Sequence, residues 1–237
     1  MAIRSRPMVS TQEVSERIVL LDSARMSEEV RTEEREAEER RLELEMVERR
    51  EAALAHVVKF GDPVLKSKAS PVSNFGPELR AEVERMYAIM RDGLGVGLAA
   101  TQLGVLRRLL VFHAGPDGEP SALVNPEVEW LSEETAVAEE GCLSLPRVTM
   151  DVERPLYARF SGRDIEGAPV ELEAAGLEAR VLQHEIDHLD GVLILDRTSR
   201  DQRKAALRAL REGTSYSPSA EEEIGEEGEL REPRTDA

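Results

Sequence analysis

The sequence has little that would tie it to the cell exterior or to a membrane. It contains a single cysteine, Cys142, so no intramolecular disulfide can form and a disulfide-stapled secreted scaffold is excluded. The longest apolar runs, such as Leu109–Phe112, have the length of a strand and cannot cross a bilayer. Acidic residues flank the apolar patch Ile18–Leu21, which fits neither a secretory nor a transit peptide. These absences predict a soluble protein of a reducing compartment, the cytoplasm.

Positive charge is also scarce. The chain has 48 acidic and 31 basic residues, which give a formal net charge of −17. A protein that wraps nucleic acid or lies on an anionic membrane needs a basic footprint. We therefore expect neither a DNA-binding nor a membrane-associated protein, although a small basic patch is compatible with this total.

Composition divides the 237 residues into three parts. Residues 1–55 form a charged N-terminal extension, in which Glu and Arg alternate three or four positions apart and predict an exposed helix over residues 28–51. This helix is either a solvated appendage or a coiled-coil partner site, and its apolar positions are too irregular for a sustained heptad seam. Residues 214–237 are rich in Glu, Ser, Pro and Gly and predict an acidic disordered tail. Residues 56–213 remain as one compact domain.

The middle region combines helices with short strands. Apolar residues recur at helical spacing over Phe75–Gly93 and predict an amphipathic helix. Between Arg107 and Ala174, short apolar runs are separated by Gly, Pro, Asn and Asp, which predicts several antiparallel strands. Two further helices are predicted over Leu177–Asp190 and Arg200–Arg211, each followed by a glycine. The fold class is therefore α+β.

The helix predicted over residues 177–190 carries the pattern His184-Glu185-Ile186-Asp187-His188. Residues four apart share a helix face, so both imidazoles can bind one metal ion while Glu185 handles the proton of a water on it. The pattern holds two of the chain's four histidines. The alternative is a surface helix with incidental histidines.

A hydrolytic metal needs a third protein ligand and an open position for water. No histidine follows His188, and Ile194 stands where one HExxH arrangement has its third histidine. The ligand is therefore expected upstream. Cys142, in the bent segment Glu140–Pro146, is the candidate, with a buried core cysteine as the alternative for a lone thiol.

The segment Gly95–Gln102 is a third candidate for function. Its glycines and alanines allow another backbone to approach closely, and Gln102 adds an amide donor. No lysine follows, so the segment is a poor phosphate loop. It is suited to form a wall along which an extended peptide lies. Tight packing of a helix against a sheet would also explain the small residues, but not Gln102.

Taken together and in this order, the segments GVGLAATQ, EGCLS and QHEIDHLDG resemble the three signature motifs of bacterial peptide deformylases. The stretch Phe60–Leu65 is similar to the start of that family, and the resemblance runs from about Val57 to Ser199. It implies a deformylase-like fold, with antiparallel strands around a central helix that carries HExxH. It also implies the substrate, the N-formyl group on the initiator methionine of new proteins, which is released as formate.

The resemblance assigns residues to this reaction. It implies one divalent metal ion, Fe²⁺ with Zn²⁺, Ni²⁺ or Co²⁺ as alternatives, whose ligands are Cys142, His184 and His188. Glu185 would accept the proton of the attacking water and deliver it to the leaving amine. The Gln102 amide and the backbone N–H of Leu143 would help to hold the oxyanion. Gly97 and Leu143 would contact the peptide, and Val181 either lines the methionine pocket or packs in the core.

Two other functions and one partner stay open. A metallopeptidase that cleaves internal bonds would lack its usual third ligand, and a non-catalytic deformylase-like scaffold would have lost Glu185, Cys142 or Gln102. A related enzyme type docks on the ribosome through its C-terminal helix. The last predicted helix here is basic, so we hypothesise ribosomal contact, with an ordinary charged surface helix as the alternative. The basic residues of this helix are Arg200, Arg203, Lys204, Arg208 and Arg211.

Overall fold

The computed structural model describes residues 35–113 and 118–219. The chain divides into two compact units, with the boundary between Glu48 and Arg49. In the first unit, residues 35–48 are helical and almost all exposed, as the alternation of Glu and Arg predicts. Ion pairs three or four positions apart run along this helix: Arg35–Glu39, Arg40–Glu36 and Arg41–Glu38. Residues 28–34 of the predicted helix lie outside the described residues.

The second unit contains the α+β fold. Its elements are η1 (Pro63–Lys66), α2 (Pro77–Asp92), β1 (Gly97–Ala99), η2 (Ala100–Leu103), β2 (Leu109–Phe112), β3 (Ser121–Leu131), β4 (Thr135–Cys142), β5 (Leu145–Pro155), β6 (Tyr157–Arg163), β7 (Pro169–Ala175), α3 (Gly176–Leu189), η3 (Ile194–Asp196) and α4 (Arg200–Glu212). The predicted helices are confirmed to within two residues at each end. Every strand pair is antiparallel, as expected.

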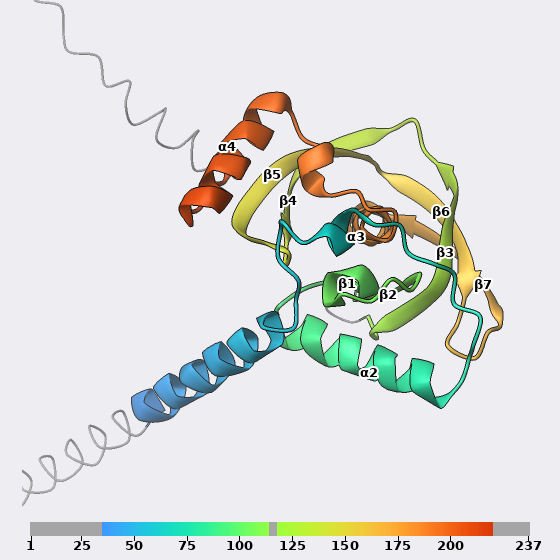
Figure 1. The fold of residues 1–237 in the computed structure, drawn as a ribbon, viewed down its shortest axis with the longest axis horizontal. Helices are drawn as coiled ribbons and strands as arrows, with labels where there is room; N and C mark the ends of the chain where they lie inside the picture. The colour runs from blue at the N-terminus through green and yellow to red at the C-terminus, as the bar shows by residue number, and fades with distance from the viewer. Residues whose placement is uncertain (1–34, 114–117, 220–237) are drawn as a thin grey trace, which may run out of the picture. The chain divides into compact units, whose positions relative to one another are not determined.

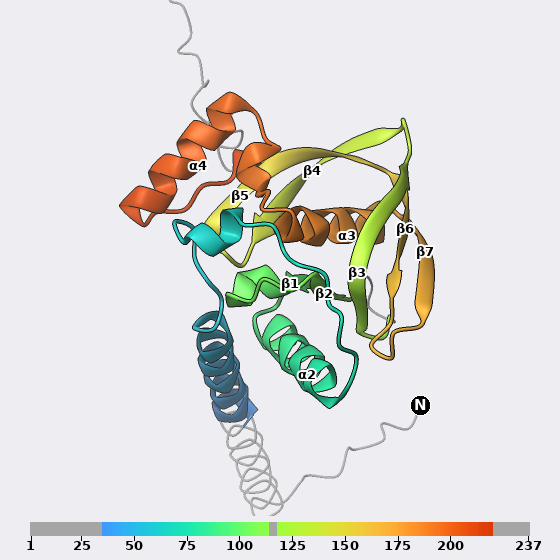
Figure 2. The ribbon, with the colours of Figure 1, turned by 45° about the vertical axis from the view of Figure 1, so that its right-hand side comes forward.

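The strands form a five-stranded sheet in the order β1-β2-β3-β6-β7 and a separate β4–β5 hairpin. Helix α3 lies between the sheet and the hairpin, with α2 packed beneath β1 and β2 and α4 against the outside of β5 (Figures 1 and 2). One apolar cluster joins α3 to the five-stranded sheet, and another joins β5, η3 and α4. The α3 helix is therefore central, as the resemblance implies.

Local sequence explains where the helices begin and end. Pro77 occupies the first turn of α2, where its missing N–H leaves no helical hydrogen bond unmade, and Gly93 follows the last turn. The Ser199 side chain accepts a hydrogen bond from the backbone N–H of Gln202 at the start of α4. Gly213, with φ of 68°, ends α4 in the left-handed conformation.

Two features of the strands differ from the short, even runs expected. β3 and β5 each have eleven residues, and the register of β4 and β5 shifts between Gly141 and Cys142.

Downstream of α4, Tyr216 forms a parallel bridge with Val148 of β5. Residues 214–219, which composition assigns to the tail, therefore lie against the hairpin; residues 220–237 are outside the described residues. In the described part of the chain, no helix is long and apolar enough to span a membrane.

Candidate active site

Helix α3 has one apolar and one polar face, and the polar face carries the HExxH pattern. Leu182 and Ile186 pack in the cluster with the five-stranded sheet. His184 and His188 lie one turn apart with their rings edge to face and the ring centroids 4.9 Å from each other, and their Nε2 atoms are 3.2 Å apart. The helical spacing therefore brings two imidazole nitrogens to one point, as predicted.

The hairpin delivers a third donor to this point. Cys142 ends β4 at the register shift, and its Sγ lies 3.2 Å from the Nε2 of His188. The donor atoms of Cys142, His184 and His188 all lie within 4.8 Å of one another. Metal–nitrogen bonds of about 2.0–2.1 Å at tetrahedral angles give donor–donor separations of roughly 3.3–3.4 Å. The donor set and its spacing thus fit one divalent ion.

Glu185 lies beside these donors and is buried. Its Oε2 atom has no hydrogen-bond partner among the described residues, and burial raises the pKa of its carboxyl. Strand β1 passes so close that a Cβ at Gly97 would lie 2.4 Å from Oε1 of Glu185. Any side chain at position 97 would displace this carboxylate from its place, so Gly97 makes room for Glu185, a role that sequence analysis did not assign to it.

Gln102 is buried, and its amide has a fixed orientation. Its Oε1 accepts a hydrogen bond of 2.9 Å from the backbone N–H of Ala99. Its Nε2 lies 3.6 Å from Sγ of Cys142 and 3.5 Å from Oγ of Ser144. The Oε1 atom of Gln102 is thus bonded to the backbone of the segment that carries Gln102, and the Nε2 donor faces Cys142.

Leu143 lies beside the Gly93–Gly97 segment. The backbone of Leu143 is held by Lys59, a residue that sequence analysis missed. The Leu143 side chain is close to Gly95, where an added Cβ would be 3.1 Å away from Cδ1. The Nζ of Lys59 donates a hydrogen bond of 3.1 Å to the carbonyl of Leu143. One residue further on, the N–H of Phe60 donates to the carbonyl of Ser144 at 2.9 Å. The segment at residues 59–60 therefore fixes the loop that follows Cys142.

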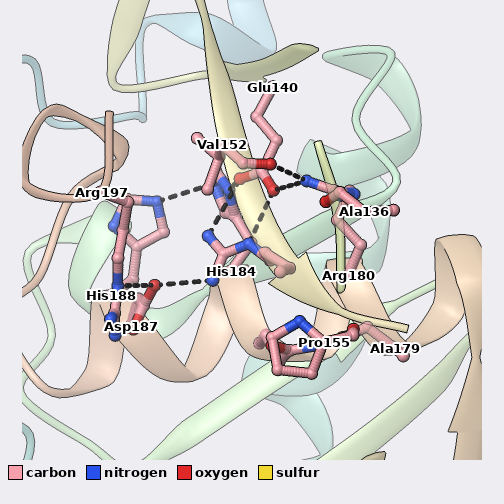
Figure 3. A network of polar contacts seen from close by, with 12 residues as sticks. Ala136, Glu140, Val152, Pro155, Ala179, Arg180, His184, Asp187, His188 and Arg197 are labelled. Atoms are coloured by element: carbon pink, nitrogen blue, oxygen red, sulfur yellow. Dashed lines mark hydrogen bonds and ion pairs between the residues drawn. The ribbon is translucent and has the colours of Figure 1, made fainter. Parts of the chain in front are cut away.

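A buried ionic network contacts His184 at Nδ1, the ring nitrogen that faces away from the other donors (Figure 3). The Nδ1 of His184 is 2.9 Å from Oε2 of Glu140, which leaves its Nε2 facing Cys142 and His188. Glu140 also accepts hydrogen bonds from Arg154 and Arg180, each of 2.6 Å. Burial opposes the ionisation of Glu140, but the hydrogen bonds from His184 and Arg154 outweigh it and lower its pKa to about 2.

The same network returns to α3 through Asp187. Arg154 donates to this carboxylate at 2.9 Å, and Arg197, which follows η3, donates to its other oxygen at 2.6 Å. Figure 3 shows Asp187 of the helix beside Arg197. The network therefore ties the hairpin, α3 and the segment after η3 to one another. Within it, Glu140, His184 and Asp187 belong to segments that sequence analysis singled out, whereas Arg154, Arg180 and Arg197 do not.

The site opens into a cavity of about 410 Å³. Residues expected at the site that line it are Gly97, Gln102, Cys142, Leu143, Val181, His184 and Glu185. Val181 is only 5% exposed and also belongs to the apolar cluster of α3, so it takes part in both the cavity wall and the core. His188 is 1% exposed and lies behind the cavity wall.

The family model for polypeptide deformylase matches residues 54–204. The chain belongs to this family. A peptide deformylase of Acidothermus cellulolyticus is 48% identical over 153 residues, which cover 65% of this chain and 83% of the relative. Peptide deformylase 1 of Corynebacterium glutamicum is 46% identical over 161 residues, 67% of this chain and 95% of the relative.

Solved structures of deformylases agree with this assignment. The crystal structure of the Thermotoga maritima peptide deformylase is 45% identical and matches with a TM-score of 0.59, covering 60% of this chain and 96% of that one. A peptide deformylase from Synechococcus elongatus, solved in complex with actinonin, is 39% identical with a TM-score of 0.63, covering 67% and 88%. The expected family and fold are thus confirmed. This deformylase is a metal-dependent hydrolase that removes the formyl group from the formylmethionine of newly synthesised proteins.

Proposed function

We propose that Cys142, His184 and His188 hold one Fe²⁺ ion and that Glu185, Gln102 and Leu143 carry out deformylation beside it. The observation that carries this proposal is the convergence of three donor atoms within 4.8 Å, next to a buried carboxylate oxygen with no described partner. A divalent ion held there supplies Lewis acidity toward the formyl oxygen and a water molecule.

The donor set supports a transition metal. Burial opposes ionisation of the Cys142 thiol, but the imidazoles of His188 and His184 outweigh it and hold the pKa well below its usual value. A thiolate with two imidazoles suits iron, zinc, nickel or cobalt. The choice of Fe²⁺ rests on the family resemblance. Exposure to oxygen would then inactivate the enzyme by oxidising the iron and Cys142.

Glu185 is the proposed proton carrier. Burial raises the pKa of its carboxyl, which brings the group closer to the neutral range where one side chain can both accept and release a proton. Its free Oε2 accepts the proton of the attacking water and passes it to the nitrogen of the leaving amine. Gly97 makes room for this carboxylate.

Two donors stabilise the oxyanion in this proposal. The Gln102 amide, fixed by its bond to Ala99, and the backbone N–H of Leu143 donate to the former formyl oxygen. Each such donor is worth about 3 kcal/mol in comparable sites. The backbones of Gly97 and Leu143 hold the peptide in extended form, and Val181 contacts the methionine side chain in the cavity.

Formate release from a short formyl-Met peptide tests this proposal. The full chain is purified without oxygen, loaded with iron and compared with a Glu185→Ala variant whose metal content is measured. We expect activity in the parent and none in the metal-loaded variant. Full activity in that variant would contradict the role of Glu185, and an inactive parent that holds one metal per chain would contradict the substrate.

We also propose a division of the chain into three parts and a compartment in which the enzyme acts. Residues 56–213 form the catalytic domain, and this division is supported by the family match to residues 54–204. Residues 1–55 are proposed as a charged N-terminal extension, of which residues 35–54 are helical, and residues 214–237 as an acidic tail, of which residues 214–219 lie against the hairpin. The enzyme acts in the cytoplasm, where new chains carry formylmethionine.

The basic face of α4 is proposed to contact the ribosome. Arg200, Lys204 and Arg211 lie four and seven positions apart and share one side of the helix. Ala206 and Ala209 on the other side are buried against β5, so deletion of the helix would disturb the fold. Charge reversal of Lys204 and Arg211 to Glu is the cleaner test. Unchanged co-sedimentation of this variant with ribosomes would contradict the contact.

A further inference from the structure

We infer that Arg50 and Arg147, at the rim of the cavity, make this deformylase prefer formyl peptides with a carboxylate two or three residues after the formylmethionine. The inference rests on the proposed function and specifies its substrate class. Both arginines line the cavity that contains Cys142, His184 and Glu185. The recognised group is a side-chain carboxylate of Asp or Glu, because a planar guanidinium pairs well with that group.

Arg50 is placed by the end of the N-terminal helix, which belongs to the second unit from Arg49 onward. Ala53 is 6% exposed and anchors the last turn in the cluster around α2. Leu54 packs on that cluster together with Leu143 of the active site. Arg50 is four residues before Leu54 and so lies one turn further out on the same helix face. The family match begins at residue 54, so Arg50 is an addition outside the matched domain.

Arg147 is placed by an irregular turn in the hairpin. The register passes from Cys142 opposite Leu145 to Gly141 opposite Thr149, so Arg147 lies in the bulge between these pairs. Its φ is 61°, in the left-handed region that disfavours residues with a side chain. The N–H of Tyr216 donates to the carbonyl of Arg147 at 3.0 Å and fixes the bulge. A strained arginine held at a cavity mouth is typical of a binding role.

The other charged groups of the cavity are engaged. Glu140 is bound by Arg154 and Arg180, and Glu185 belongs to the reaction. The carboxylate of Glu139 accepts hydrogen bonds from three hydroxyls, those of Thr149, Ser217 and Ser219. By contrast, neither Arg50 nor Arg147 has an ion pair with any residue that the structure describes. Two cations with no ion-pair partner in the described part of the chain therefore attract an anionic substrate group locally, despite the chain's net charge of −17.

Chain geometry gives the register of the carboxylate. The formyl group must reach the donors of Cys142 and His184, which are at most half-exposed, while Arg50 and Arg147 are exposed residues of the same cavity lining. An extended peptide advances about 3.3 Å per residue, so the second and third residues after formylmethionine lie roughly 7–10 Å further along. These two positions, beyond the methionine that enters the cavity, are the ones proposed to meet the arginines, and the test peptides therefore carry X there.

The test compares C-terminally amidated peptides of the form formyl-Met-X-X-Ala, with X as Glu, Gln or Lys, on the iron-loaded full chain. We expect kcat/KM to fall from Glu to Gln to Lys, by about two- to fivefold per step, as for solvent-exposed ion pairs. The change is expected mainly in KM, because the contact is equally present before and during the reaction. Raising the ionic strength should reduce the preference.

Variants assign the preference to the two arginines. Arg50→Gln and Arg147→Gln should each reduce the Glu-to-Gln ratio, the double variant should remove it, and Arg50→Lys should retain part of it. Arg85→Gln is the matched control, since Arg85 is an exposed residue of α2 that does not line the cavity. Thermal melting of each variant verifies that it is folded.

Four results would overturn the inference or its basis. Equal kcat/KM for the Glu and Gln peptides, or a ratio that persists in the double variant, would refute the role of the arginines. A gain seen only when the C-terminal amide is replaced by a free carboxylate would refute side-chain recognition. Absence of formate from every peptide would instead refute the proposed function itself.

Discussion

The two faces of α3 are built on opposite principles. On one face, Leu182 and Leu189 are fully buried against the five-stranded sheet. On the other, His184 and Asp187 are held by the charged groups of Glu140 and Arg154, which are almost as deeply buried. Apolar burial stabilises the fold without requiring one exact arrangement, whereas a buried charge must be paired in a defined geometry. The apolar face therefore keeps the helix in place, and the polar face orients the donors.

The largest expected effect is on the polar face. Glu185→Gln keeps the size of the side chain but removes its ability to carry a proton, so kcat should fall by about 10²–10⁴-fold. The free energy of unfolding should not fall, because the carboxylate oxygen that is lost has no described hydrogen-bond partner. Formate release and urea unfolding measure the two quantities. A variant with lost activity and lost stability would contradict the separation of the faces.

The converse change is on the apolar face. Leu182→Ala leaves a cavity in the core and should lower the free energy of unfolding by about 2–5 kcal/mol. At a temperature where the variant is fully folded, kcat for a formyl-Met peptide should stay close to that of the parent. Urea denaturation followed by circular dichroism gives the stability. A large fall in kcat without a change in stability would show that the faces are not separate.

The ionic network supports the polar face, and Glu140→Gln tests this support. The variant loses the paired hydrogen bonds with Arg154 and weakens the support of the His184 ring, so metal affinity should fall by about 10–100-fold. Competition with a chromophoric chelator measures this affinity. Glu139→Gln is the control, because the carboxylate of Glu139 contacts Ser217 and Ser219 and not His184. Equal affinities for both variants would contradict the proposed support.

The smallest effect is expected for a half-exposed ion pair outside the network. Burial opposes ionisation of Asp196, but hydrogen bonds from Lys66 and the N–H of Leu193 outweigh it and lower its pKa from 3.8. A lowered pKa stabilises the fold above the unfolded value, and this contribution is lost as the pH falls through the folded value. Asp196→Asn should therefore cost less than about 1 kcal/mol at pH 7, and the cost should shrink at an acidic pH below the usual pKa of 3.8. Urea unfolding at the two pH values measures the difference, and a constant cost would contradict the titration.

The sequence was sufficient for features that depend on near neighbours. Helix spacing predicts that His184, Glu185 and His188 share a site, and the elimination of downstream ligands points to Cys142. The ionic network could not be predicted from the sequence, because Arg154 and Arg197 are brought to Asp187 only by the register of the hairpin and the path of the chain after η3. Lys59 was missed for the same reason: 84 positions separate it from Leu143.

Gly97 shows a different limit. The glycine correctly indicates a close approach, and the sequence assigns that approach to a bound peptide. In the structure the nearest group to a Cβ at this position is the carboxylate of Glu185. A small residue thus reports that something is near without reporting what it is. The residue near Gly97, Glu185, belongs to another motif of the same sequence.

The pairing of Tyr216 with β5 has a consequence for solubility. The N–H of Thr149 donates to the carbonyl of Tyr216, and the N–H of Tyr216 donates to the carbonyl of Arg147. A chain cut after Gly213 would present these groups of the hairpin as an open strand edge, and such edges recruit strands of other molecules. We therefore expect residues 214–219, by covering this edge, to keep the deformylase from self-association.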